Sequence, residues 1–173
     1  MNILSPRRFK SRRLGPLSDT EIATRATAYA LKDTKTPAAV VDTAAREMAA
    51  LITGPCWLVP IPSSTGDTRA NAILAAAIAM HCPGAQVVKA IYRTQPVESQ
   101  CQRHKAGLGP IARDAHHLRR VPKQLGLRQV YFVDNVTTSG NTMHAARQAL
   151  GYGSGLVFAD ARHQQPDSQQ RLL

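Results

Sequence analysis

Residues 134–142 combine side chains and backbone groups that can hold a phosphorylated sugar. An apolar run ends at Asp134 and Asn135, whose short polar side chains can hydrogen-bond to neighbouring hydroxyl groups. Hydroxyls, an amide and a glycine follow at Thr137, Thr138, Ser139, Gly140, Asn141 and Thr142. A glycine lets the backbone approach an anion, and a helix N-terminus attracts negative charge. A sugar phosphate would satisfy both halves of this segment; the alternative is an ordinary polar N-cap of a helix.

The elements around this segment predict an α/β domain with a mainly parallel sheet flanked by helices. Short apolar runs predict buried strands at 56–61, 86–92, 129–134 and 155–160. Helical spacing of apolar residues predicts one helix between Asp67 and Pro83 and another over 141–150. Ligands of such sheets bind at the carboxyl ends of the strands, so the loops after the first and third strands are the candidate ligand loops.

Two further helices are predicted ahead of this core. Ser18 and Glu21 have the spacing of a capping box. Thr36 and Pro37 have the types expected for the N-cap and first residue of the second helix. The predicted organisation is a basic arm, a single domain with its core, and a polar tail: residues 1–17, 18–163 (core 56–160) and 164–173.

The charge of the chain is large and localised. Its 173 residues include 22 Lys and Arg against 11 Asp and Glu, a formal charge of +11. Residues 1–13 hold five basic side chains and no acid, and residues 89–128 hold nine against Glu98 and Asp114. Two basic segments on a neutral body indicate a polyanionic partner, either nucleic acid or a phosphate-rich small molecule. Non-specific nucleic-acid binding is therefore kept open for residues 7–13 and 89–128.

Several classes of protein are not expected. No apolar run is long enough to span a bilayer, and no apolar segment of a signal peptide follows the basic N-terminus. The three cysteines have no CxxC spacing, and His116 and His117 are adjacent, a poor arrangement for a metal pair. We therefore expect a cytoplasmic protein that contacts no membrane and has no metal site built from its own side chains.

The segment before and after Asp134 resembles the 5-phosphoribosyl-1-pyrophosphate (PRPP) motif of type I phosphoribosyltransferases. The resemblance covers residues Tyr131 to Asp134, Val136, Thr138, Ser139, Gly140 and Thr142. Asn135 differs from the family pattern, which most often has a second acid there. The resemblance implies the phosphoribosyltransferase type I fold, with two extra N-terminal helices. It also implies that Asp134 and Asn135 hold the ribose hydroxyls and that Thr138 to Thr142 hold the 5′-phosphate.

Two other segments resemble the same family. Residues Leu58 to Asp67 are similar to its pyrophosphate loop in the Val-Pro-x-Pro form of the ComF-like (competence protein F-like) branch, and Arg69 and Asn71 partly match the Arg-Gly-Phe-Asn of that branch. The resemblance implies that pyrophosphate binds at Ser63, Ser64, Thr65, Gly66 and Arg69, although Pro/Ser/Gly runs are often simple turns.

Residues 93–117, which we call the hood segment, resemble the flexible hood that closes over PRPP. This implies that Lys89, Arg93, Arg103 and Lys105 neutralise the departing pyrophosphate. With Asp134 and Asn135, the last two are the candidate catalytic residues.

The sequence thus favours a phosphoribosyltransferase-like enzyme that binds PRPP or a nucleotide with Mg²⁺. It would transfer phosphoribose to a nitrogenous base and release pyrophosphate, and the substrate would hold Mg²⁺. The base stays undetermined, with Asp160 and Arg162 as candidate selectivity residues, and a homodimer is left open. The alternative is a catalytically weak or inactive protein of the same fold that binds nucleic acid or regulates through its basic segments.

Overall fold

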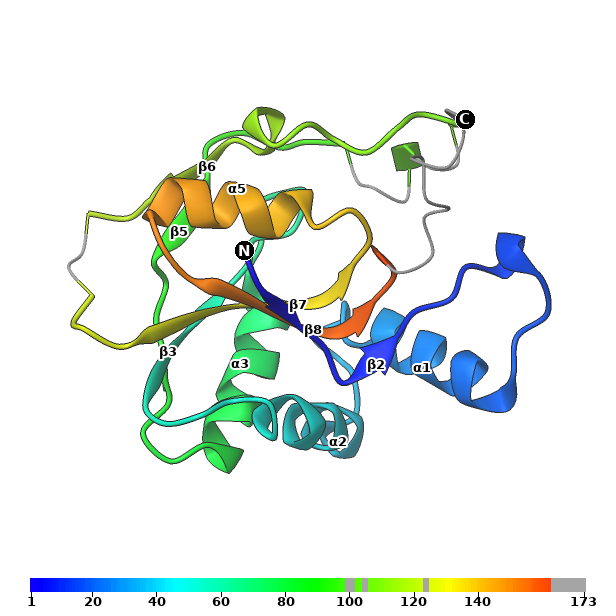
Figure 1. Cartoon of the computed structure of the whole chain (residues 1–173), viewed down its shortest axis with the longest axis horizontal. Helices are drawn as coiled ribbons and strands as arrows, with labels where there is room; N and C mark the ends of the chain where they lie inside the picture. Colours follow the sequence, from blue (N-terminus) through cyan, green and yellow to red (C-terminus); the bar gives the residue numbers. More distant parts are fainter. Residues whose placement is uncertain (99–101, 104–105, 123–124, 163–173) are drawn as a thin grey trace, which may run out of the picture.

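The computed structural model describes residues 1–98, 102–103, 106–122 and 125–162 (Figure 1). Its centre is a parallel sheet with the order β1-β8-β7-β3-β4, in which β2 also pairs with β8. The strands are β1 (Ile3–Leu4), β2 (Arg7–Arg8), β3 (Cys56–Pro60), β4 (Gln86–Val87), β7 (Gln129–Thr137) and β8 (Ser154–Asp160). The predicted α/β class with a mainly parallel sheet is confirmed.

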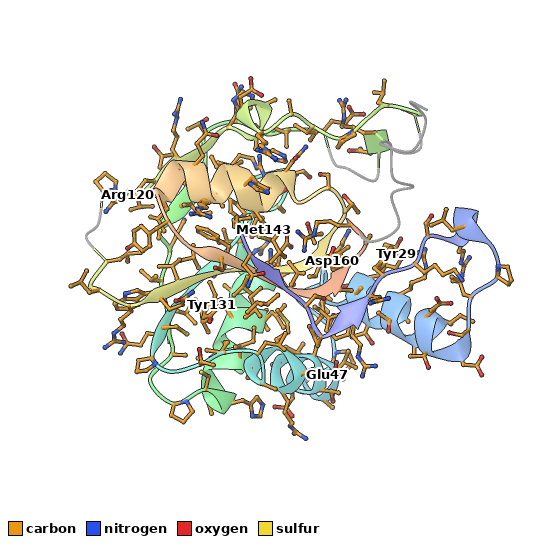
Figure 2. The ribbon with its side chains drawn as sticks, viewed as in Figure 1. Tyr29, Glu47, Arg120, Tyr131, Met143 and Asp160 are labelled. Carbon is orange, nitrogen blue, oxygen red and sulfur yellow. The ribbon has the colours of Figure 1, made fainter. Side chains whose placement is uncertain are left out.

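Helices cover both faces of the sheet (Figure 1). The helices on one face are α1 (Asp19–Ala30), α2 (Ala38–Ala49) and α3 (Arg69–His81), and the other face carries α5 (Asn141–Leu150). Tyr131 of β7 packs in the cluster under α1–α3, whereas its neighbour Phe132 packs with Met143 of α5. Figure 2 labels Tyr131 and Met143, one from each cluster. Because both faces are covered, β7 has an almost continuous apolar sequence, typical of a central parallel strand.

The first residues form the edge of the sheet, not the separate basic arm predicted for 1–17. Ile3 lies beside Gly155 and Arg8 beside Asp160, and the Phe9 N–H donates to the Asp160 carbonyl at 2.9 Å. Ile3 and Phe9 are buried, so this segment has apolar anchors among its charges. Arg7 forms two hydrogen bonds, of 2.7 and 2.5 Å, with the Glu47 carboxylate of α2. Part of the N-terminal charge is therefore neutralised within the fold.

The two N-terminal helices are confirmed, with a change at the second. Ser18 and Glu21 form the predicted capping box of α1, with hydrogen bonds of 2.8 and 3.3 Å. Pro37, not Thr36, is the N-cap of α2, and the Thr36 hydroxyl donates instead to the Ala30 carbonyl at the end of α1. The prediction that Thr36 caps α2 was therefore wrong, because this hydroxyl closes the turn between the helices.

The predicted strand at 86–92 is divided between two sheets. β4 belongs to the main sheet, whereas β5 (Ile91–Arg93) pairs antiparallel with β6 (Leu118–Arg120). β6 was not predicted, because it is three residues long and two of them are arginine. The two strands bring the ends of the hood segment together. No helix among the described residues has the length and apolar character needed to cross a membrane.

Gly153 controls how closely β8 approaches β7. Its φ is +122°, and a Cβ atom there would lie 2.7 Å from Cε2 of the fully buried Phe132. We expect Gly153→Ala to lower the free energy of unfolding by about 3 kcal/mol, from backbone strain and displacement of the ring. Gly151 is the matched control, because its φ is +97° but no atom lies within 4 Å of a Cβ there.

Gly151→Ala should lower the free energy of unfolding by only about 1 kcal/mol, because it adds backbone strain but no clash. Urea unfolding of both variants measures the difference, and equal losses would contradict the proposed contact with Phe132.

Candidate functional site

The strand connections diverge between β3 and β7. From β3 the chain passes through α3 to β4 on one side, and from β7 it passes through α5 to β8 on the other. The β3–α3 loop (61–68) and the β7–α5 loop (138–140) therefore open at the same edge of the sheet from adjacent strands. In parallel α/β sheets such a divergence leaves a crevice in which ligands bind. The two candidate loops therefore follow neighbouring strands. The sequence did not predict this, because it did not give the order of the strands in the sheet.

Asp134, near the carboxyl end of β7, lies beside the start of the β3–α3 loop. The Asn71 side-chain amide donates to the Ile61 carbonyl at 2.8 Å and to Asp134 Oδ1 at 3.1 Å, linking α3, the β3–α3 loop and β7. The Asn135 backbone N–H donates to the same Oδ1 at 2.8 Å. Burial raises the pKa of Asp134, and these two hydrogen bonds oppose the shift. Both of these bonds end on Oδ1. Asn71, in an Arg-x-Asn segment, was not among the predicted site residues.

Asn135 is turned away from Asp134. Successive side chains of a strand point to opposite faces, and the Asn135 amide donates to the Ala28 carbonyl of α1 at 2.7 Å. Asn135 is 6% exposed. The structure therefore does not bring this side chain to the predicted ribose site; it attaches β7 to α1 instead.

The residues of the β7–α5 loop divide into accessible and committed groups. Thr138 is exposed, and Ser139 and Thr142 are half-buried at the start of α5. Gly140 is the N-cap of α5 with a φ of +78°, a conformation that favours glycine. Thr137 is buried within β7, and the Asn141 amide donates to the Ile111 carbonyl of the hood segment at 2.8 Å. Of the six residues expected to bind phosphate, Thr137 and Asn141 are thus committed to the fold, and Thr138, Ser139, Gly140 and Thr142 are the better candidates.

An ion pair between the buried Asp160 and the half-buried Arg162 lies beside Gly140. Asp160 is 3% exposed and accepts hydrogen bonds of 2.6 to 3.0 Å from the Arg162 guanidinium. A Cβ at Gly140 would lie 3.3 Å from Cδ of Arg162, so the arginine stem borders the start of α5. The sequence suggested Arg162 for base selection, whereas the structure places its charge next to the β7–α5 loop.

The β3–α3 loop is a closed turn. The Ser63 N–H donates to the Asp67 carbonyl at 2.8 Å, the Gly66 N–H donates to the Ser63 carbonyl at 3.0 Å, and the hydroxyls of Ser63 and Thr65 are 3.0 Å apart. The Arg69 guanidinium donates to both carboxylate oxygens of Asp67, which holds the pKa of Asp67 down to about 2. Arg69 thus lies at the predicted loop, but its guanidinium is already paired with Asp67. The acid two residues before it in the sequence could have indicated this pairing.

Arg93 joins the hood segment to the β3–α3 loop. Its guanidinium donates to the Ser63 carbonyl at 2.8 Å, to the Pro62 carbonyl at 3.3 Å and to the His116 carbonyl. Burial lowers the pKa of Arg93, and the nearby Asp134 opposes this shift. The Val97 N–H adds a bond of 2.9 Å to the Ser64 carbonyl. In this structure Arg93 holds the backbone of the β3–α3 loop by donating hydrogen bonds to the loop's carbonyl groups. This role differs from the predicted neutralisation of pyrophosphate.

Arg103, a candidate catalytic residue of the hood segment, is paired within that segment and not with Asp134. Arg103 donates to the Gly109 carbonyl at 2.8 Å and forms an ion pair of 3.3 Å with Glu98, both within the hood segment. Lys105 lies outside the described residues. Arg103 therefore does not add to the geometry around Asp134.

His116 is a buried imidazole at the base of the hood segment, in the short 3-10 helix η2 (Asp114–His116). It is 5% exposed, and neither ring nitrogen has a hydrogen-bond partner among the described residues. Burial and the charges of Arg93 and His117 lower the pKa of His116 to about 4, so the ring is neutral at pH 7.

Compared with known proteins, the chain matches no protein-family model, no curated protein and no solved structure.

Asn135 gives a test of the strand alternation at the site. We expect Asn135→Ala to lower the free energy of unfolding by about 1–3 kcal/mol, because the buried Ala28 carbonyl loses its donor. Asn135→Asp, which introduces the acid of the family pattern, should cost more, because a carboxylate would face that carbonyl. Urea unfolding measures both, and an Asp variant as stable as the parent protein would contradict the assigned contact.

His116 predicts a specific pH dependence of stability. Its pKa is about 4 in the folded protein and about 6.5 in an unfolded chain. Between these values the unfolded state binds the extra proton, so stability is complete above pH 6.5 and falls as the pH decreases toward 4. This contribution amounts to about 2 kcal/mol between pH 7 and pH 5.

His116→Phe should remove that part of the decrease when the free energy of unfolding is measured at the two pH values. An unchanged difference between them would show that another group is responsible.

Proposed function

We propose that this protein is a phosphoribosyltransferase-like protein of the ComF-like branch that binds PRPP, or a nucleotide, with Mg²⁺ between β3 and β7. One observation carries the proposal: the Asp134 carboxylate stands near the point where the strand connections diverge, and the two loops that open there contain hydroxyl groups and a glycine. A ribose with phosphate groups at both ends has the matching chemistry. Its hydroxyls need an acceptor in the middle, and its phosphates need donors on either side.

Each part of the ligand has a supporting element. The exposed Thr138, the Ser139 hydroxyl and the N–H groups of the first turn of α5 would hold the 5′-phosphate, because the first N–H groups of a helix have no backbone partner within it. One of them, the Asn141 N–H, donates to Ser139 Oγ at 3.3 Å and would exchange this bond for one to the phosphate. Asp134 Oδ2 would accept from a ribose hydroxyl. The pyrophosphate would accept hydrogen bonds from the hydroxyls of Ser63 and Thr65, and it would replace Asp67 as the partner of the Arg69 guanidinium.

Transfer would break the bond between ribose C1 and the pyrophosphate oxygen and form a bond from C1 to a nitrogen of the base, which loses its proton. The protein would contribute orientation and electrostatic stabilisation of the leaving group. Among the described residues no group of three or more His, Cys, Asp or Glu side chains could hold a metal ion. Mg²⁺ would therefore arrive as part of the substrate, bound by phosphate oxygens and water.

A second candidate function is ligand binding without turnover. Asn135 is committed to α1, Arg69 to Asp67 and Arg103 to the hood segment. These commitments favour a protein of the same fold that senses the ligand, or that binds nucleic acid through its basic segments.

Calorimetry with Mg²⁺ and PRPP, and with ribose 5-phosphate, tests the proposal. We expect Asp134→Asn and Thr138→Ala each to weaken binding roughly tenfold to hundredfold, as for hydrogen bonds of charged groups worth about 1.5–3 kcal/mol. Asp19→Asn, in the first turn of α1, is the matched control and should bind as the parent protein does.

Pyrophosphate release in the presence of a panel of nucleobases separates the two candidates. Release supports the transferase, and PRPP binding without release supports the second function. If neither sugar phosphate binds, the transferase and the sensor of this ligand are both overturned, and only nucleic-acid binding through the basic segments is left to test.

A further inference from the structure

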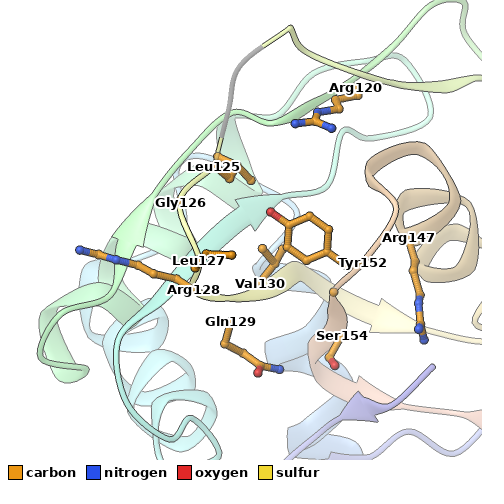
Figure 3. A pocket seen from close by; sticks show the side chains of 11 residues that line it. Arg120, Leu125, Gly126, Leu127, Arg128, Gln129, Val130, Arg147, Tyr152 and Ser154 are labelled. Atoms are coloured by element: carbon orange, nitrogen blue, oxygen red, sulfur yellow. The ribbon is translucent and has the colours of Figure 1, made fainter.

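A basic groove lies at the amino ends of the strands, whereas Asp134 lies near the carboxyl end of β7. The groove is formed where β7 and β8 begin, next to the end of β6 and the last turns of α5, and its volume is about 660 Å³ (Figure 3). Its principal lining residues are Arg120, Leu125, Leu127, Arg128, Arg147 and Tyr152. Because parallel strands have their amino ends on one edge and their carboxyl ends on the other, this groove is separate from the proposed PRPP site.

The charge of the groove has one sign. Arg120 comes from β6, Arg128 directly precedes β7, and Arg147 comes from α5. The lining contains no Asp or Glu in the part of the chain that the structure describes. Arg128 is held at the rim, since its guanidinium lies 4.9 Å from the centre of the Trp57 ring and donates to the Gly84 carbonyl at 3.3 Å. Charges of one sign in a concave surface concentrate counter-ions, so the groove attracts an anion.

The groove also has a flat apolar surface. Tyr152 lies between Gly151 and Gly153, is 40% exposed, and stands in the middle of Figure 3 between the chains of Arg120 and Arg147. Leu125 and Leu127 border it, and Leu127 is fully exposed. An exposed aromatic ring beside aliphatic side chains is a surface on which a nucleobase stacks.

We propose that this groove binds a nucleoside polyphosphate, with the base on Tyr152 and the phosphates on Arg120 and Arg147. The volume lies within the range of about 300–1,000 Å³ typical of small-molecule sites, which favours one free nucleotide over a strand of nucleic acid. Arg147 is exposed, and in Figure 3 its guanidinium points away from the ring. Exposed side chains change rotamer within picoseconds to nanoseconds, so it can turn toward a bound phosphate.

Trp57 provides a local signal for this binding. It is the only tryptophan of the sequence, it lies at the amino end of β3, and its Nε1–H donates to the Gly126 carbonyl of the groove at 3.3 Å. Its fluorescence therefore reports on the groove and not on the loops at the other edge of the sheet. We expect Mg²⁺–ATP to cause a saturable change, with weaker binding of tripolyphosphate, which lacks the base, and of adenosine, which lacks the phosphates.

Matched variants assign the contacts. Arg147→Glu should weaken ATP binding at least roughly tenfold, because a cation is replaced by an anion. Arg119→Glu makes the same change of charge at the neighbour of Arg120 that does not line the groove, and it should have no effect. Tyr152→Ala should weaken binding several-fold, whereas Tyr152→Phe should retain it because the ring is kept. Circular dichroism and thermal melting confirm that each variant is folded.

Several results would overturn the proposal. One is the absence of a saturable fluorescence change with ATP; another is an equal loss in Arg119→Glu and Arg147→Glu. Loss of the ATP signal in Asp134→Asn but not in Arg147→Glu would move the nucleotide to the other edge of the sheet. A response to an oligothymidylate without a response to ATP would reassign the groove to nucleic acid.

Discussion

The central position of β7 is the constraint on which the other features depend. The strand pairs with β3 on one side and β8 on the other, and helices cover both of its faces. Its side chains alternate between two closed layers, and Asp134 and Asn135 must therefore face opposite ways. One becomes the acceptor at the candidate site, and the other joins β7 to α1. The sequence thus suggested one ligand site for Asp134 and Asn135, whereas in the fold Asp134 is a candidate site residue and Asn135 has a structural role.

Backbone carbonyls carry much of the organisation around the site. Asn71 holds the Ile61 carbonyl, Arg93 holds those of Pro62 and Ser63, and Asn141 holds that of Ile111. Amide and guanidinium groups suit this role, since they donate several hydrogen bonds from one rigid plane. These bonds attach α3 and the hood segment to the β3–α3 loop, and α5 to the hood segment. Several polar residues that the sequence offers as ligand groups therefore serve to fix the loop backbones.

Local patterns in the sequence predicted the elements that depend on local contacts. The capping box of α1, the apolar run of β7 and the helix after Gly140 all follow from neighbouring residues. β1, β2 and β6 could not be predicted, because they have two or three residues, several of them arginine, and exist through pairing with distant strands. The order of the strands, and with it the meeting of the two loops, also depends on distant contacts. The candidate loops could thus be found from the sequence, while the orientation of Asn135 and the partners of Arg69 and Arg93 needed the fold.

The pairing of β1 with β8 has a consequence for how the site comes into being. Ile3 lies beside Gly155, so this contact closes almost the whole length of the chain. The same Ile3 side chain borders Gly140, where a Cβ would lie 3.3 Å from its Cδ1. Contacts of such long sequence separation form at a high entropic cost and slow the folding of the domains that contain them. During synthesis, the wall of the β7–α5 loop is therefore incomplete until β8 has emerged and the first residues have returned to it.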